Sequence, residues 1–102
     1  MQYLLVIQFS EEVFSDFDLL IEFEDGLIEA LGDKGDVDGH DIGVGEVNFF
    51  IFTDDHHGSF ERVSEYCSRV DTSGMKVAFR NVDGEDYTSI WPTTQDGQFS
   101  VA

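Results

Sequence analysis

The chain of 102 residues is strongly acidic: 22 Asp and Glu stand against five Lys and Arg, which gives a formal net charge of −17. Hydrophobic residues make up 41% of the chain and include ten Phe, enough for one core, so intrinsic disorder is not expected. A charge of this sign repels nucleic acid and anionic membranes, whose recognition depends on Lys and Arg, so we expect neither as a partner.

Three explanations of the acidity stay open. It can serve solubility, it can be an adaptation to high salt, or it can form a functional surface for a basic partner, whose encounter it would speed. The single cysteine, Cys67, cannot form an internal disulfide. The N-terminal residues lack the basic flank and cleavage site of a signal peptide, and no apolar run approaches the ~18 residues of a membrane span. We therefore expect a cytosolic protein.

The N-terminal third predicts a strand followed by a helix. Residues 3–9, YLLVIQF, are nearly continuously apolar and predict a buried strand. Ser15 should open a helix, because SDFD resembles a capping box with Asp18 in place of Glu. Gly26 should weaken this helix by about 1 kcal/mol relative to Ala, and Gly32 suits its C-terminal end. The apolar positions at near-helical spacing are Phe17, Leu20, Ile21, Leu27, Ile28 and Leu31.

Two strands with a tight reversal follow. Residues 37–44, VDGHDIGV, are polar and interrupted by Gly39, which suits an edge strand with a bulge. Residues 46–53, EVNFFIFT, are rich in β-branched and aromatic side chains and predict a clear strand. Gly43 and Gly45 fit the reversal between the two.

The remainder predicts a second helix and two more strands. The helix should run from about Asp55 to Val70, with Thr53, Asp54 or Asp55 as its N-cap. Its apolar face consists of Phe60, Val63, Cys67 and Val70. MKVAFRNV and DYTSIWP are the strands, and DGE between them signals a turn. Residues 93–102 should form a polar tail that frays.

The predicted order is therefore β-α-β-β-α-β with one further strand. This is the split βαβ, or ferredoxin-like, arrangement of an α+β domain. It implies an antiparallel sheet in the order 4-1-3-2, with the fifth strand outside the fourth and both helices on one face. Residues 3–9 would then pair with both 46–53 and 75–82. We expect residues 1–92 to form this single domain.

The whole chain also resembles small, uncharacterised bacterial proteins of the same layout. The segment VDGHDIGVGEVNFFIFTDD, residues 37–55, carries the resemblance. It implies the ferredoxin-like fold but no activity, since that fold hosts many unrelated functions.

The sheet face away from the helices should carry an aromatic pair. If Ile51 faces the core, the alternation along the strand puts Phe50 and Phe52 on the opposite, helix-free face. Exposed aromatic surface of this size usually marks an interaction site. The simplest way to bury these side chains is a homodimer through this face. The two alternatives are that the C-terminal tail folds across the face or that an apolar ligand binds there.

Two of the five bases should share one side of a strand. Lys76 and Arg80 lie two residues before and after Ala78, so all three side chains should lie on the same side of the strand. We favour pairing of the two bases with acids over binding of an anion. The candidate interaction residues are thus Phe50, Phe52, Val6, Leu4, Lys76 and Arg80.

The segment 36–58 is dense in acids, histidines and glycines, which raises the question of a metal site. The weak candidate ligands are His40, His56, His57 and Asp38. Their spacing fits neither an EF-hand loop nor an HExxH motif. We therefore expect no metal and no cofactor, and we place His56 and His57 in the exposed first turn of a capped helix. Gly43 and Gly45 have no following Lys, which argues against a nucleotide-binding loop.

The sequence favours binding over catalysis. Cys67 lies on an apolar helix face, where a buried thiol is expected rather than a nucleophile, and we assign no catalytic residue. The favoured function is an acidic, non-enzymatic interaction domain for a basic protein, of the inhibitor or immunity type. Residues 11–41 support it with twelve acids against Lys34 alone. The alternative is a small-ligand-binding or enzymatic ferredoxin-like dimer that uses the sheet face or the cleft near His40.

Overall fold

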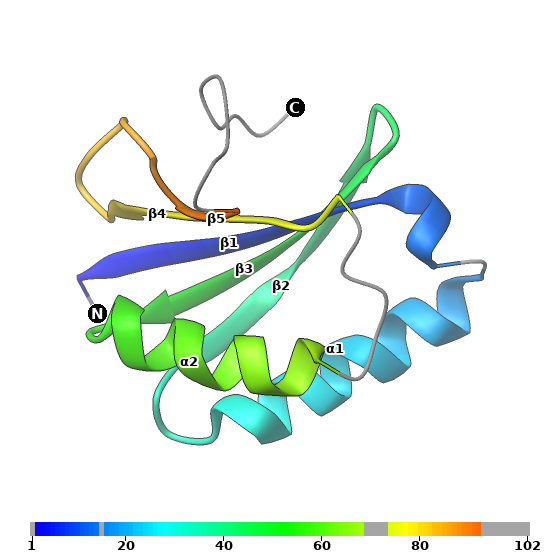
Figure 1. Ribbon diagram of the computed structural model, residues 1–102, viewed down its shortest axis with the longest axis horizontal. Helices are drawn as coiled ribbons and strands as arrows, with labels where there is room; N and C mark the ends of the chain where they lie inside the picture. Colours follow the sequence, from blue (N-terminus) through cyan, green and yellow to red (C-terminus); the bar gives the residue numbers. More distant parts are fainter. Residues whose placement is uncertain (1, 15, 69–73, 93–102) are drawn as a thin grey trace.

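The computed structural model describes residues 2–14, 16–68 and 74–92. In chain order the elements are β1 (Tyr3–Ser10), the 3-10 helix η1 (Glu11–Val13), α1 (Phe17–Leu31), β2 (Asp36–Gly43), β3 (Glu46–Thr53), α2 (His56–Cys67), β4 (Lys76–Asn81) and β5 (Thr88–Trp91). The strands form one antiparallel sheet in the order β2-β3-β1-β4-β5, with both helices on one face (Figure 1). This confirms the ferredoxin-like fold with an extra C-terminal strand.

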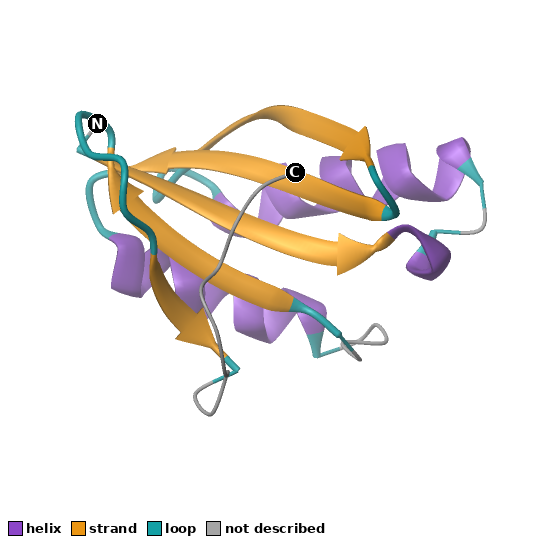
Figure 2. Cartoon of the chain, turned by 90° about the horizontal axis from the view of Figure 1, so that it is seen from above, coloured by secondary structure: helices purple, strands orange, loops and turns teal. Residues whose placement is uncertain are grey.

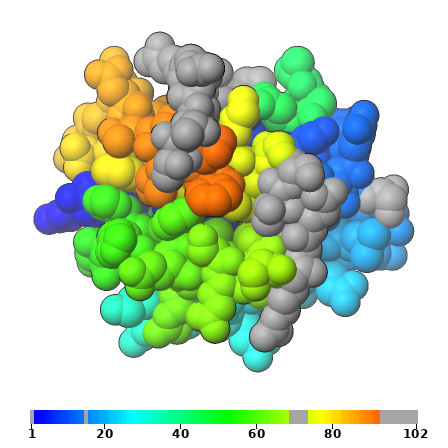
Figure 3. Space-filling view, viewed as in Figure 1, coloured from blue at the N-terminus to red at the C-terminus, as the bar shows by residue number. Residues whose placement is uncertain are grey.

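The central position of β1 follows from its apolar character. It pairs with β3 on one side, where Leu5 lies opposite Ile51, and with β4 on the other, where Leu5 lies opposite Phe79. The predicted pairing of residues 3–9 is therefore confirmed. Seen from above, the two helices lie behind the same sheet face (Figure 2). In the space-filling view, α2 fills the lower centre and β5 lies above it (Figure 3).

The main core lies between this face and the helices, and aromatic rings supply much of it. Phe23 of α1 contacts Phe9 and Phe49 at ring-centroid distances of 5.5 and 5.1 Å. The buried side chains of α1 are Leu20, Phe23, Leu27 and Leu31. The predicted face was thus partly wrong, because Phe17 and Ile28 are 58% and 49% exposed and Phe23 takes the central position instead.

The start of α1 also differs from the prediction. The N-cap is Asp16, whose Oδ1 accepts a hydrogen bond of 2.9 Å from the backbone N–H of Leu19, and the helix begins at Phe17. Asp is as good a cap as Ser, so SDFD contains two candidates and the spacing alone does not choose between them. Ser15 itself lies outside the described residues. Gly32 ends the helix with a positive φ of 57°, and its N–H donates to the carbonyl of Ile28.

The β2–β3 hairpin has the expected irregularity and an unexpected turn. The register shifts between Val37 and Gly39, which confirms the bulged edge strand. The loop consists of Val44 and Gly45, with φ of 49° and 78°. Two positive φ values are typical of a type I′ turn, which normally excludes a β-branched residue.

α2 begins at His56, one residue later than predicted. Val70, which was predicted to belong to this helix, and residues 93–102 lie outside the described part of the chain. None of the helices in the described part is long and apolar enough to span a membrane.

Candidate functional site

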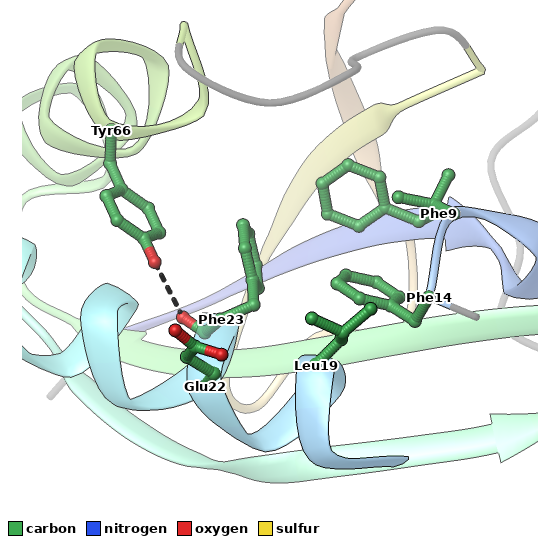
Figure 4. Close-up of a pocket in the computed structure, with 7 residues that line it drawn as sticks. Phe9, Phe14, Leu19, Glu22, Phe23 and Tyr66 are labelled. Carbon is green, nitrogen blue, oxygen red and sulfur yellow. Dashed lines mark hydrogen bonds between the residues drawn. The ribbon is translucent and has the colours of Figure 1, made fainter. Parts of the chain in front are cut away.

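The structure contains a cavity of about 330 Å³ between η1, the start of α1 and the end of α2 (Figure 4). Its described lining residues are Phe9, Val13, Phe14, Leu19, Glu22, Phe23 and Tyr66. Glu22 is the only charged side chain among them. We call this region the cavity end of the molecule. Its size and apolar lining, with a few polar groups, are those of ligand pockets in general.

The walls of the cavity are an extension of the aromatic core. Phe9 ends the buried part of β1, and η1 then turns the chain so that Phe14 packs against both Phe9 and Phe23, at centroid distances of 5.5 and 5.3 Å. Ser10 caps η1 by accepting from the backbone N–H of Glu12. The turn thus brings two rings of the N-terminal segment to face the first turns of α1 instead of solvent.

Tyr66 forms the wall on the side of α2. Its hydroxyl donates to the backbone carbonyl of Phe23 at 3.1 Å, and the two rings lie 5.2 Å apart (Figure 4). A Cβ on Gly26 would overlap the Tyr66 hydroxyl, so the glycine that weakens α1 is the residue that lets Tyr66 approach it. Burial, and secondarily the nearby Cys67 thiol and Glu22, raise the pKa of Tyr66, which keeps its hydroxyl protonated as a donor.

An acidic stripe borders this cavity along the solvent side of α1. It consists of Asp18, Glu22, Asp25 and Glu29, all exposed and spaced at i, i+4, i+7 and i+11. α1 contains no Lys or Arg of its own, and the base at its last turn comes from α2, where Arg62 Nη1 donates to the Ala30 carbonyl at 3.5 Å. Like charges at this spacing destabilise a helix, as does an acid near its C-terminus. Asp18 lies in the first turn, where an acid is favourable, but the like-charge spacing and Glu29 near the C-terminus work against the stability of the helix.

The opposite end of α2 is sealed by hydrogen bonds. Thr53 Oγ1 and Ser59 Oγ lie 2.8 Å apart, and they lie 2.8 and 3.0 Å from the carbonyl oxygen of Lys34. Because each hydroxyl has one proton, one can donate to this carbonyl while the other donates either to it or to the first hydroxyl. Thr53 Oγ1 also accepts from the N–H of Asp55, and both hydroxyl residues are fully buried. We call this region the hydrogen-bonded end. It ties the loop after α1 to the junction of β3 and α2.

Asp55 is the N-cap that the sequence offered among three alternatives. Its Oδ1 accepts a hydrogen bond of 2.9 Å from the N–H of Gly58. This hydrogen bond is the largest influence on its carboxyl group and lowers its pKa below the ordinary value.

The three histidines lie in three different environments. His40 contacts Glu24 through Nδ1 at 3.0 Å, and His57 contacts Glu61 through Nε2 at 3.1 Å. His56 was predicted to be exposed, and this was wrong: its ring stacks on Phe79 at 3.7 Å, and its Nδ1 is buried with no hydrogen-bond partner among the described residues. Asp38 is exposed on the bulged edge strand. Among the described residues no group of three or more His, Cys, Asp or Glu is placed to hold a metal ion.

The helix-free sheet face holds the predicted interaction residues. Phe50 and Phe52 pack with Leu4, Val6 and Ala78 in a second, smaller apolar cluster. Leu4, Val6 and Ala78 are buried and the two Phe are only partly exposed, so less aromatic surface is free than the sequence suggested. The homodimer through this face stays a prediction.

The two bases on β4 behave differently. Lys76 is exposed opposite Gln8, whose Nε2 donates to Asn48 Oδ1 at 3.0 Å in a buried polar pair. Arg80 was expected to pair with acids. It instead donates through Nη1 to the carbonyls of Asn81, Val82 and Gly84, and its guanidinium carbon lies 5.7 Å from the Tyr87 ring centroid. Arg80 therefore holds the loop that follows β4.

Cys67 is buried at the end of α2, as the sequence predicted. Burial raises the pKa of its thiol from 9.0 to about 11, so the thiolate needed for nucleophilic attack is not formed near neutral pH.

Comparison with known proteins gives no further constraint. No protein-family model, no curated protein and no solved structure matches the chain. Of what the resemblance to small bacterial proteins implied, only the ferredoxin-like fold is shown. The sequence also gave no direct sign of the cavity. The one available signal was Gly26, because a glycine inside a helix lowers the stability of that helix and therefore suggests that close packing requires it.

Proposed function

We propose that the chain is a non-enzymatic, cytosolic interaction domain that binds a basic protein through the acidic stripe of α1, as an inhibitor or immunity-type binder does. The observation that carries the proposal is the stripe itself. Four exposed carboxylates are aligned on one helix face without a base in that helix, at a cost to helix stability. A surface that serves solubility needs acids, but it does not need them in a line.

A basic partner would relieve this cost on binding. Each exposed ion pair contributes 0.2–1 kcal/mol or so, and several pairs formed together add to a tenfold or larger gain in affinity. The net charge of −17 would in addition speed the encounter with a cationic surface. Both effects weaken when salt screens the charges.

The test compares two variants with the same net charge. In one, the stripe residues Asp18, Glu22, Asp25 and Glu29 become their amides. In the other, the same change is made at four exposed acids on other elements, namely Asp38, Asp83, Glu85 and Asp86. The probe is a short fluorescent peptide of alternating Lys and Ser, and its affinity is measured by anisotropy at low salt and at about 500 mM NaCl.

We expect the stripe variant to lose about tenfold in affinity at low salt and the second variant to lose much less. Circular dichroism serves as the folding control, and the stripe variant should melt at least as high as the wild type because it removes like-charge contacts. An equal loss in both variants would show that only net charge matters, and it would sink the proposal.

A further inference from the structure

The cavity end suggests what the basic partner presents beside its positive charge. We infer that the cavity receives an apolar side chain of the partner, next to a Lys or Arg that pairs with Glu22. This inference rests on the proposed function, because it assumes a basic partner on α1.

The lining determines the chemistry of the occupant. Phe9 and Phe23 are almost fully buried, while Phe14 and Val13 are partly exposed and Leu19 is exposed at the mouth. An apolar cavity of about 150 Å³ is known to hold benzene, so a volume of about 330 Å³ admits a Leu or Phe side chain with room to spare. The hydroxyl of Tyr66 already donates to the Phe23 carbonyl, so it does not require a partner from the ligand.

The charge of the surroundings determines what must flank that side chain. Glu22 is exposed, lines the cavity and belongs to the acidic stripe. An anionic amphiphile such as a fatty acid would therefore be repelled. A neutral apolar molecule would leave the stripe unused. A partner segment with a cationic residue beside an apolar one matches both the apolar cavity and the acidic stripe. An apolar side chain that fills a pocket with polar surroundings is also a common arrangement at interface hot spots.

The experiment uses two peptides that differ at one position. Both alternate Lys and Ser, but one carries a central Leu where the other carries Ser. Their affinities are measured by anisotropy for the wild-type chain and for two matched pairs of variants. Leu19→Lys is compared with Ile28→Lys, since both residues are exposed apolar side chains of α1 and only Leu19 lines the cavity. Glu22→Gln is compared with Glu29→Gln for the same reason.

We expect the Leu peptide to bind the wild type about tenfold more tightly than the Ser peptide. Leu19→Lys should abolish this preference, and Ile28→Lys should keep it. Glu22→Gln should weaken the Leu peptide by about threefold more than Glu29→Gln does. Melting curves of all four variants confirm that each is folded.

The possible failures separate the two proposals. If neither peptide binds, the proposed function fails and the inference with it. If both bind equally and the stripe variant weakens both, the proposed function stands and the cavity has no part in it. A Leu preference that survives Leu19→Lys would place the apolar contact elsewhere. Binding of free indole, abolished by Leu19→Lys, without any Leu preference in the peptides would instead make the cavity a small-ligand site and overturn the inference.

Discussion

The two ends of α2 close the space between helices and sheet in different ways. At the hydrogen-bonded end, the Thr53 and Ser59 hydroxyls and the Lys34 carbonyl satisfy one another at 2.8–3.0 Å and leave the two hydroxyl side chains fully buried. At the cavity end, rings and aliphatic side chains meet without filling the volume between them. Polar groups must be paired to be buried, whereas apolar walls can leave an open volume that a ligand can fill.

This difference separates structural from functional residues. A network whose members are all paired has nothing left to offer a ligand, and its value is to fix the connection between two loops. An apolar cavity beside a row of acids with no base in their own helix still has contacts to gain. The comparison therefore assigns stability to the hydrogen-bonded end and recognition to the cavity end, and substitutions at each end test that assignment.

The largest effect is expected from Thr53→Val at the hydrogen-bonded end. The change keeps the shape but removes the acceptor for the Asp55 N–H and one donor to the Lys34 carbonyl. We expect the free energy of unfolding to fall by about 2 kcal/mol, the cost of unpaired buried polar groups. Chemical denaturation measures it, and Thr88→Val on the exposed part of β5 is the matched control. If Thr53→Val were as mild as Thr88→Val, the network would not stabilise the fold.

A smaller effect on the free energy of unfolding is expected from Gly26→Ala at the cavity end, and its sign should be opposite to the one that helix propensity predicts. Helix propensity alone predicts a gain of about 1 kcal/mol. The added methyl group would overlap the Tyr66 hydroxyl, and overpacking of this kind costs about 1–3 kcal/mol, so we expect a net loss of roughly 1 kcal/mol.

The double-mutant cycle shows whether the contact with Tyr66 is the cause. In a Tyr66→Ala background the obstacle is absent, and Gly26→Ala should then stabilise the protein. Denaturant titrations of the four proteins provide the comparison. A stabilising Gly26→Ala in the wild-type background would mean that Tyr66 can move away freely and that it does not define the cavity wall.

The fold was largely predictable and the cavity was not, for one physical reason. The strands and helices are indicated by patterns within single segments, and their order along the chain implied the sheet order, with which the apolar run of β1 agrees. The contact between Gly26 and Tyr66 joins residues 40 positions apart on two helices, and no periodicity encodes it. Phe23 was missed for a related reason: on α1 eight large apolar residues compete for one face, and only the position of β1 and β3 decides which are buried.

The histidines illustrate the same limit. From the sequence, His56 at the start of a helix looked exposed, but the pairing of β1 with β4 brings Tyr3 and Phe79 together, and the His56 ring packs against both. Its environment is set by the sheet and not by the helix to which it belongs.

The smallest effect is expected from alkaline pH, which acts on the cavity end. Burial raises the pKa of Cys67 to about 11 from an ordinary value of 9.0, and burial also raises that of Tyr66. The folded state therefore holds these protons to a higher pH than the unfolded state does. The contribution of Cys67 to stability is complete below about pH 9 and is lost as the pH rises toward 11, whereas that of Tyr66 is complete below about pH 10 and is lost only above it. At the hydrogen-bonded end, Asp55 titrates in the opposite sense, and its contribution is lost only as the pH falls below its ordinary value of 3.8.

We expect the free energy of unfolding to fall by roughly 1 kcal/mol or less between pH 8 and about 9.5, measured by denaturant titration at constant ionic strength. Cys67→Ala should lower the stability at every pH, because it leaves a small gap in the core, but it should flatten this alkaline decline. Tyr66 acts only above its ordinary pKa of 10.0, so extending the titration beyond pH 10 should show a further decline that Tyr66→Phe reduces. An unchanged slope in Cys67→Ala would mean that the thiol is not protected by burial. The decline would then come from other groups that titrate in this range and not from the cavity end.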